Sequence, residues 1–408
     1  MGFRVEQACP QCGAPIDIDE TDRLFACPYC GVKNFLYTPD CFRFALPHHA
    51  PGQDRVYAPY LRLKGTVFSC GSQKVYHRIV DITHRGVPFK RFPISLGLRP
   101  QAMKMRFMSP DMKGVWLKSV VDRSLLLARA AKQMTARMET EPFHTAYLGE
   151  TFNLIYLPLY LKGDILHDGI TNTPLSKMAD TKTRFKTLED PAPRWTPTFL
   201  ATLCPACGWN LEGKRDSLIL TCSNCETAWE ASRGRLVPVD VFAAQGSGAH
   251  THHLPFWKMT VRSEGTTLAS YADFIRLTNQ PKVIRPEWED RNMAIFSPAF
   301  KIRPKIFLYL SRHLTLSQGN IQIKKQFPDK KLHPVTFPLS EAIQGIKVTL
   351  GASAMNKRRL MPRLPHIRFA IKAAGLVFLP FKESAHEMIQ QDMDITINKN
   401  ALALGRYL

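Results

Sequence analysis

The sequence has no apolar stretch that approaches the roughly 20 consecutive residues of a membrane-spanning helix. Its best apolar runs, at 154–161 and 373–381, are short, and each contains a proline. The first ten residues, MGFRVEQACP, lack the apolar core of a secretory signal, and Glu6 stands where a myristoylation signal has Ser or Thr. These absences predict a cytoplasmic chain with no transmembrane segment.

Acidic residues are scarce relative to basic ones. The 408 residues include 34 Asp and Glu against 55 Lys and Arg, a formal net charge of +21. The hydrophobic content of 45% is that of a folded chain and excludes wholesale disorder. An excess of positive charge favours an anionic partner such as nucleic acid, an anionic membrane surface or an acidic protein.

Motifs of the common enzyme classes are also missing. The chain has no phosphate-binding Walker loop, no G-x-S-x-G, no H-E-x-x-H and no dinucleotide-binding fingerprint. We therefore expect a non-catalytic protein, and no residue is nominated as catalytic.

Cysteine is the informative residue type. Eight of the ten cysteines form four C-x-x-C pairs, in which a tight turn can aim two thiolates at one metal ion. Fourteen residues separate the pairs within each half, which is enough for a short hairpin. The pairs are Cys9/Cys12 with Cys27/Cys30, and Cys204/Cys207 with Cys222/Cys225.

Three of the pairs read C-P-x-C-G, and this pattern resembles the zinc-ribbon class. The resemblance covers about 25 residues in each half. It implies two structural zinc ions per chain, each held by four cysteines with no open coordination position for a substrate. Disulfides, an iron site and a redox switch that releases zinc are the alternatives. Cys41 and Cys70 stand apart and are expected to be buried thiols.

Four landmarks recur in the same order, which predicts two similar domains. They are Cys9/Cys204, Pro59/Pro255, Ser109/Ser297 and Leu157/Leu379, at offsets of 195, 196, 188 and 222. The rise from 188 to 222 places an insertion of about 34 residues in the second copy, within about 302–370.

The pattern predicts an α+β, β-rich fold in which each copy is a zinc ribbon followed by an antiparallel sheet with one or two helices. The predicted parts are ribbon 1 (1–40), body 1 (41–180), a linker (181–198), ribbon 2 (199–235) and body 2 (236–408).

Several elements can be predicted within the two bodies. Residues 74–83 favour a strand, and the strands that contain Pro59, Pro158, Pro255 and Pro380 are expected at sheet edges or bulges. Ser109-Pro110 is typical of a helix start. In the second copy the helix is expected to restart at Pro304 and to run over 305–315.

Positive charge is concentrated on the two bodies. Residues 55–137 carry 17 basic and 3 acidic residues, and residues 301–372 carry 15 and 2. Both ribbons are slightly acidic, with 3 basic and 6 acidic residues in 1–40 and 2 and 4 in 204–230. We therefore expect the bodies, and not the ribbons, to contact an anionic partner.

The densest basic clusters can be interpreted in two ways, as an ordinary solvated surface or as an anion-binding site. In an anion-binding site, each cation near a phosphate adds salt-sensitive affinity. No motif for reading specific bases accompanies them. The candidate residues are Lys324, Lys325, Lys330, Lys331, Lys357, Arg358 and Arg359.

Five histidines precede the matching strands but have no carboxylate partner at a suitable spacing, so surface histidines are favoured over a third metal site. They are His48, His49, His250, His252 and His253.

Together these features predict a non-catalytic zinc protein whose basic bodies bind nucleic-acid backbone, DNA or RNA, without base specificity. The alternative is a scaffold protein that docks on a protein complex or on an anionic membrane surface.

Overall fold

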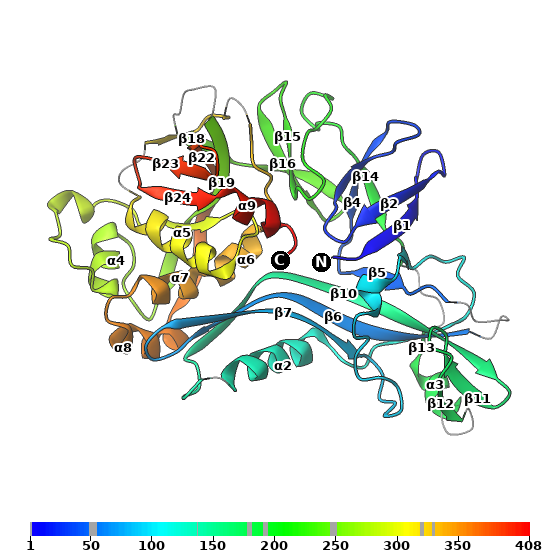
Figure 1. The fold of residues 1–408 in the computed structure, drawn as a ribbon. Coiled ribbons are helices and arrows are strands. Elements are labelled where there is room, and N and C mark those ends of the chain that lie inside the picture. Colours follow the sequence, from blue (N-terminus) through cyan, green and yellow to red (C-terminus); the bar gives the residue numbers. More distant parts are fainter. Residues whose placement is uncertain are drawn as a thin grey trace.

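The computed structural model describes residues 2–48, 55–136, 138–177, 182–190, 195–244, 251–318, 322–328 and 331–408. The α+β, β-rich class is confirmed, because strands dominate both halves and the helices lie beside the sheets (Figure 1). Among these residues, no helix is long and apolar enough to cross a membrane.

The first half is organised around one sheet of eleven strands. Its main path runs β13-β9-β6-β10-β5-β8-β1-β2, with β7 beside β6 and β11–β12 beside β10. The elements are β1 (Arg4–Ala8), β2 (Pro15–Asp19), β3 (Leu24–Ala26), β4 (Lys33–Tyr37), β5 (Phe42–Ala45), β6 (Arg55–Cys70), β7 (Val75–Arg85), α1 (Arg99–Ala102), β8 (Met105–Phe107), β9 (Val115–Leu117), α2 (Arg123–Thr135), β10 (His144–Lys162), β11 (Ile165–Asp168), β12 (Pro174–Lys177), α3 (Lys182–Leu188) and β13 (Glu189–Asp190).

The second half contains a seven-stranded sheet with the path β20-β19-β22-β18-β21, extended from β22 by β23 and β24. Ribbon 2 adds the sheet β15-β16-β17, whereas β14 pairs back onto β4 of ribbon 1. The elements are β14 (Thr198–Ala201), β15 (Ile219–Cys222), β16 (Thr227–Ser232), β17 (Arg235–Val239), β18 (Val241–Ala244), β19 (Thr251–Glu264), α4 (Tyr271–Thr278), η1 (Pro286–Trp288), β20 (Ile295–Pro298), α5 (Pro304–Leu316), β21 (Ile323–Lys324), α6 (Leu339–Gln344), α7 (Ile346–Ser353), α8 (Lys357–Leu360), η2 (Met361–His366), β22 (Arg368–Glu383), β23 (Glu387–Gln390), β24 (Ile395–Asn398) and α9 (Lys399–Gly405).

One long antiparallel strand pair forms the centre of each half, β6 with β10 and β19 with β22. In the first pair Pro59 faces Tyr156, and in the second Pro255 faces Phe378. These positions are related by the offsets of 196 and 222 that the sequence landmarks give. The landmarks Pro59/Pro255 and Leu157/Leu379 therefore occupy the same register positions in the two halves.

The neighbours of these pairs follow the same pattern. A short parallel strand pairs with the second strand of each central pair. Phe44 of β5 faces Ile155 of β10, and Phe242 of β18 faces Val377 of β22. On the same side each later strand continues into a hairpin, β10–β11 and β22–β23. The order of strands around the central pair is thus shared over four strands of each half.

The prediction that the proline-containing strands lie at sheet edges or bulge at proline is wrong, because all of them are central and the register shifts lie at Leu148/Thr151 and Thr260/Val261. Each proline instead lies where one neighbouring strand ends and the next begins. The carbonyl of Pro59 accepts from Gly86 N–H at 2.7 Å, and that of Pro158 accepts from Gly169 N–H at 2.8 Å. The missing N–H of proline points to the same side as its carbonyl, so it falls in a gap between neighbours and costs no ladder bond.

The Ser-Pro landmarks do not occupy equivalent places. Residues 105–107 form β8, which pairs with β1 and β5, whereas 295–298 form β20, which pairs with β19. The helix predicted to start at Ser109 begins instead at Arg123, where the Asp122 side chain accepts from Leu125 N–H. The helix predicted after Pro304 is confirmed as α5.

The two halves share a hydrophobic core. Phe68, Cys70 and Leu148 of the first sheet belong to the same buried cluster as Phe307, Leu350 and Met361 of the second half. The rings of Phe68 and Phe307 lie 5.8 Å apart. Helices α5, α6 and α7 therefore cover one face of the first sheet, while α2 packs on the other (Figure 1).

This shared core predicts cooperative unfolding. Phe68→Ala should lower the free energy of unfolding by about 3–5 kcal/mol and should move the denaturant transitions of both halves together. Tryptophan fluorescence and circular dichroism across a denaturant series measure this. Leu98→Ala, at a side chain that is 78% exposed, is the control and should change stability by less than about 0.5 kcal/mol. Separate transitions for the two halves would contradict the prediction.

Candidate metal centres and basic surface

In ribbon 1 each C-x-x-C pair is closed by a backbone turn. The N–H of Gly13 donates to the carbonyl of Cys9, and that of Gly31 donates to the carbonyl of Cys27, both at 2.9 Å. Both glycines have φ of +73°, which only glycine adopts at little cost. The glycine after each pair therefore turns the chain so that both sulfurs face the same point.

Ribbon 2 repeats this construction with one substitution. Gly208, with φ of +74°, donates its N–H to the carbonyl of Cys204 at 2.8 Å. After the fourth pair, Cys222/Cys225, the left-handed position is occupied by Glu226, with φ of +54°. A non-glycine residue in this conformation costs about 1–2 kcal/mol, so the site imposes a turn that the local sequence disfavours.

The sulfurs of each ribbon converge on one point. Sγ of Cys9 lies 3.8 Å from that of Cys30, and Sγ of Cys204 lies 3.6 Å from that of Cys225. Four sulfurs at tetrahedral corners are about 3.8 Å apart when the metal–sulfur bonds are about 2.3 Å. All four sulfurs of each group lie within 4.8 Å of one another, so each group could hold one metal ion.

Backbone N–H groups lower the pKa of a cysteine thiol in each ribbon. The N–H groups of Cys30 and Tyr29 lower the pKa of the Cys27 thiol to about 7. Desolvation opposes ionisation at Cys204, but the N–H groups of Ala206 and Cys207 prevail and lower its pKa to about 6. Because the thiolate is the ligand form of cysteine, each site has a starting point for metal binding near neutral pH.

Within the described parts of the chain, only the two cysteine groups bring three or more potential ligand atoms together, and the other described cysteines and histidines do not belong to them. Burial raises the pKa of Cys41 to about 11 and that of Cys70 to about 12, which fits the predicted buried thiols. His252 pairs with Glu383 at 2.8 Å, and His253 is buried. His48 is half-buried, while His49 and His250 lie outside the described residues.

A buried ion network joins ribbon 1 to the first sheet. Glu20, in the turn between β2 and β3, forms an ion pair with Arg62 and lies 3.7 Å from Lys64 Nζ, both on β6. Arg62 is fully buried and also contacts Asp81 of β7 with Nε at 2.8 Å from Oδ1 and Nη2 at 2.8 Å from Oδ2. The turn of ribbon 1 is therefore fixed on the sheet through two carboxylates and one guanidinium.

Asp22, two residues further on, extends the network to the rest of the molecule. It is 1% exposed and pairs with Arg215 of ribbon 2 at 2.6 Å and with Arg406 beyond α9 at 3.2 Å. Burial raises the pKa of this carboxyl although both arginines oppose the shift. The backbone adds a direct link, because Leu24 N–H donates to the carbonyl of Arg215 at 2.9 Å.

A cavity of about 150 Å³, lined mostly by charged and polar residues, lies where the two ribbons and the two bodies meet. Glu341 of α6 accepts hydrogen bonds from the N–H groups of Gly149 and Glu150, in the β-bulge of β10. Burial raises the pKa of Glu341 to about 7, although the neighbouring Lys301 opposes this. Burial also lowers the pKa of Lys301.

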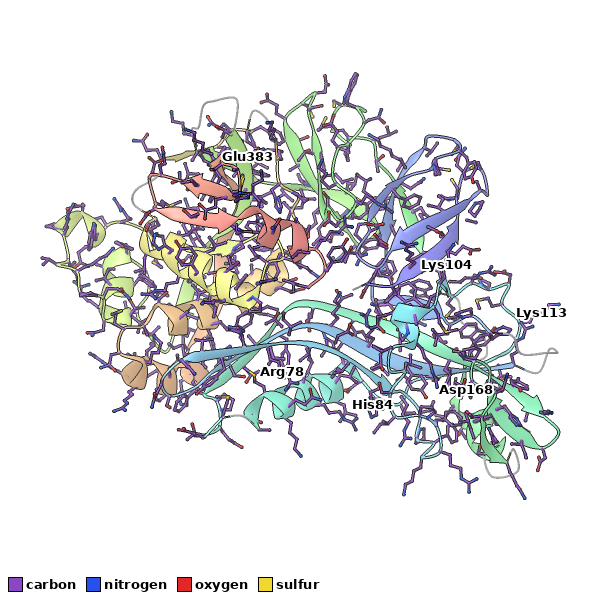
Figure 2. All side chains as sticks on the ribbon, in the orientation of Figure 1. Arg78, His84, Lys104, Lys113, Asp168 and Glu383 are labelled. Carbon is purple, nitrogen blue, oxygen red and sulfur yellow. The ribbon has the colours of Figure 1, made fainter. Side chains whose placement is uncertain are left out.

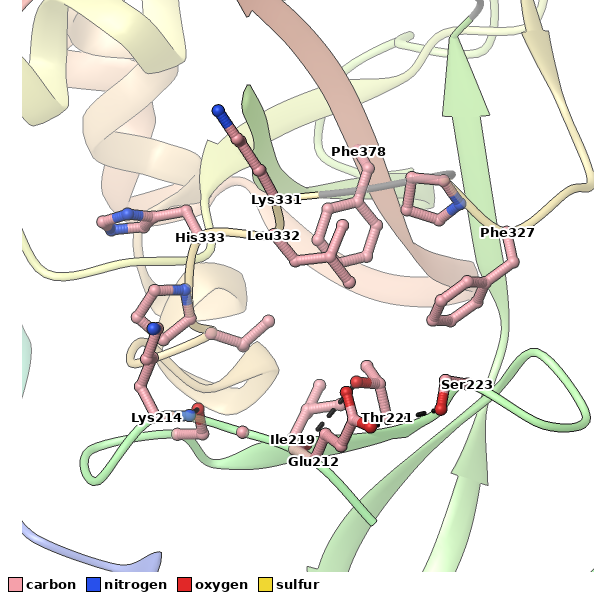
Figure 3. A pocket seen from close by; sticks show the side chains of 15 residues that line it. Glu212, Lys214, Ile219, Thr221, Ser223, Phe327, Lys331, Leu332, His333 and Phe378 are labelled. Carbon is pink, nitrogen blue, oxygen red and sulfur yellow. Dashed lines mark hydrogen bonds between the residues drawn. The ribbon is translucent and has the colours of Figure 1, made fainter. Parts of the chain in front are cut away.

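A second cleft of about 360 Å³ separates ribbon 2 from body 2 (Figure 3). Its lower wall is polar, with Ser223 donating to Glu212 Oε1 at 3.2 Å, and its upper wall is formed by Phe327 and Phe378. Burial lowers the pKa of His333, at one end, to about 4, so this imidazole is neutral.

The predicted anion-binding residues do not form one site. Lys324 and Lys325 lie on and after β21, which pairs with β18 at one end of the second half, and Lys325 contacts Asp240 at 3.0 Å. Lys331 is exposed near the cleft of Figure 3. The second group, Lys357, Arg358 and Arg359, forms α8, well apart from β18 (Figure 1). Lys330 lies outside the described residues.

Helices α5 and α7 add cations that sequence clustering missed, and Arg312 of α5 lies close enough to Lys357 of α8 to act on it. Lys357 donates to the carbonyl of Ala354 at 2.6 Å, and burial and then Arg312 lower its pKa. Burial and then Arg368 lower the pKa of Lys347. Within the described chain, no ion pair forms at any member of this group. We name the group the α5–α8 patch, and its members are Lys305, Arg312, Lys347, Lys357, Arg358 and Arg359.

Comparison with known proteins gives no relative, since no family model, no curated protein and no solved structure matches this chain.

The buried Glu341 predicts a specific pH dependence. Its pKa is raised from 4.5 to about 7 in the folded chain, so its favourable contribution is complete below pH 4.5 and is lost as the pH rises to about 7. Glu341→Gln keeps an acceptor for the two N–H groups and cannot ionise. The variant should gain about 2–3 kcal/mol of stability relative to the parent between pH 4.5 and pH 8.

Urea unfolding of both chains at several pH values measures this difference. The same measurement on Glu287→Gln, an exposed carboxylate of η1, is the control. A difference between Glu341→Gln and the parent that does not change with pH would contradict the prediction.

Proposed function

We propose that this chain is a non-catalytic zinc protein in which each four-cysteine group holds one structural zinc ion. The sulfur spacing supports this proposal, as do the four-sulfur ligand sets, which leave no position for a substrate. Tetrahedral thiolate sites suit zinc, and iron is the alternative ion.

We propose further that the two halves arose by internal duplication. The matched registers of Pro59 and Pro255, and of the parallel strands β5 and β18, support this. The helices α5 to α8 lie in the interval where the sequence offsets place the insertion. An insertion of about 34 residues is shorter than the stretch from α5 to α8, so only some members of the α5–α8 patch belong to the part of the second copy that the first copy lacks.

The function that we propose is binding of nucleic-acid backbone without base specificity. The observation that carries it is the α5–α8 patch, where six cations on α5, α7 and α8 have no ion-pair partner among the described residues and Arg312 lies close enough to Lys357 to lower its pKa. Unpaired cations that repel one another gain most from an anionic polymer, because each phosphate contact releases a counterion. The first half adds Arg129 and Lys132 on the outer side of α2.

A scaffold role is the second candidate, and the ribbons favour it. Tyr29, within a C-x-x-C pair, is 69% exposed, and Trp209, directly after Gly208, is 54% exposed. Large exposed aromatic side chains on otherwise acidic modules are typical of protein-contact surfaces. In this role the ribbons dock on a protein complex and the patch contacts an acidic partner or an anionic membrane.

Zinc binding predicts two metal equivalents per chain in elemental analysis. Cys9→Ser and Cys204→Ser should each remove one equivalent, because a three-sulfur site loses most of the roughly 10–16 kcal/mol of apparent zinc-binding energy. Cys41→Ser, a buried cysteine outside both groups, should retain both. Iron in place of zinc, or fewer than two equivalents in the parent chain, would overturn this part of the proposal.

Binding to nucleic-acid backbone predicts that affinity for arbitrary duplex DNA and RNA falls steeply as the salt concentration rises. In gel shifts on duplex DNA, the slope of log affinity against log salt should be about 0.9 per neutralised phosphate. Arg358→Gln with Arg359→Gln should weaken binding to all sequences alike and reduce the slope by up to about 1.8. Lys324→Gln with Lys325→Gln removes the same charge from a separate surface and is the matched control.

Equal losses of nucleic-acid affinity in both double variants would show that only net charge matters. That result would contradict the proposal that the α5–α8 patch is the binding surface. No binding at low salt, with retention on anionic vesicles or on a protein complex, would favour the scaffold role.

A further inference from the structure

Strand β7 forms a sheet edge that is open from Val75 to Ile82, whereas Thr83 and Arg85 at its end are hydrogen-bonded to residues 94–96. It runs for eleven residues, and in the described structure β6 is the only strand that pairs with it. The pairing with β6 is continuous from Tyr60–Arg85 to Cys70–Val75, without a bulge. The strand contains no proline and no bulge, two devices that prevent a sheet edge from pairing with another chain, although it carries the charged residues Arg78, Asp81 and Arg85.

The backbone groups on this edge can be assigned from the ladder. Gly86 N–H donates toward β6, to Pro59, whereas Arg85 N–H donates away from it, to Ile94. Because direction alternates along a strand, the N–H and C=O groups of His77, Ile79 and Asp81 also point away from β6. These six groups have no hydrogen-bond partner within the described chain.

The edge is accessible. His77, Ile79 and Asp81 are all exposed, and Ile79 is a large apolar side chain that is 46% exposed. The helices lie on the faces of the sheet, since Val67 packs toward α2 and the adjacent Phe68 packs toward α5. Figure 2 labels Arg78 and His84, which mark the course of this strand along the sheet.

The outward residues are self-complementary. If two copies of β7 pair antiparallel about Ile79, that residue faces its own equivalent in a hydrogen-bonded pair. His77 then faces Asp81 of the second copy, and Asp81 faces its His77. Asp81 accepts two hydrogen bonds from Arg62 and a longer one, at 3.5 Å, from Gln101 Nε2, and its carboxylate retains acceptor capacity. Shifting the register by two residues would lose both of these opposite-polarity pairs.

We propose that β7 is a dimerisation edge, and that two copies of this chain join their sheets through antiparallel β7–β7 pairing centred on Ile79. The pair satisfies the outward backbone groups and buries Ile79 against its equivalent. Such an interface is isologous, with one two-fold axis through the strand. The inference stands apart from anion binding and does not depend on it.

The net charge of +21 opposes association, because two copies repel each other. Raising the salt from about 0.15 M to about 1 M shortens the screening length from about 8 Å to about 3 Å. The dimer should therefore strengthen with salt, whereas nucleic-acid binding weakens. The two properties can be separated by this opposite dependence.

The experiment is sedimentation velocity of the nucleic-acid-free full chain over a concentration series at both salt levels. We expect a monomer–dimer equilibrium. Ile79→Lys places like charges at the two-fold axis and should weaken the dimer at least about tenfold. Ile165→Lys is the matched control, because Ile165 is 38% exposed on β11, which is paired on both sides.

Substitutions at His77 test the register itself. His77→Glu puts a second carboxylate opposite Asp81 and should weaken the dimer, whereas His77→Lys should preserve it. Circular dichroism confirms that each variant is folded. A chain that stays monomeric at both salt levels would overturn the proposal, as would a dimer that Ile79→Lys leaves intact. A monomer whose edge captures a strand of a different protein would also reject the second copy as the occupant.

Discussion

The short turn between β2 and β3 carries the interaction on which the rest of the arrangement depends. Glu20 and Asp22 place two buried carboxylates at the meeting point of both ribbons, the first sheet and the α9 region. Removing one partner of a buried ion pair typically costs about 3–5 kcal/mol, whereas replacing the whole set by apolar groups can be neutral. The network therefore serves to define one arrangement of the four parts more than to add stability.

Much of the local architecture could be predicted from short-range patterns. The C-x-x-C spacing and the glycine after three of the pairs specify turns that need no distant partner. The Leu-Pro and aromatic-proline landmarks marked matching strands in the two halves, because two long strands of matching register impose similar patterns, although these strands were expected at sheet edges or bulges and are central. The position of α5 followed from Pro304, whose fixed φ suits the first turn of a helix.

The remaining features depend on long-range contacts that no local pattern reveals. Prolines indicate an edge only where a neighbouring strand would need their N–H, and here each neighbour stops short of that position. Ser109-Pro110 has helix-start chemistry, but β8 and β9 on either side are drawn into the sheet. Glu20 and Asp22 appeared only as part of an acidic count, since their partners lie up to 384 residues away. The α5–α8 patch was hidden because Lys305 and Arg312 precede α8 by about 50 residues.

The pairing of Asp22 with Arg406 also has a consequence for biosynthesis. The ribosome makes ribbon 1 first, but a cation that neutralises its buried carboxylate is added 384 residues later. At roughly 5–20 residues per second, ribbon 1 waits about 20–80 s for this partner. During that interval the turn between β2 and β3 must remain hydrated, so the four-cysteine hairpin can form early while its contact with the C-terminal region forms last.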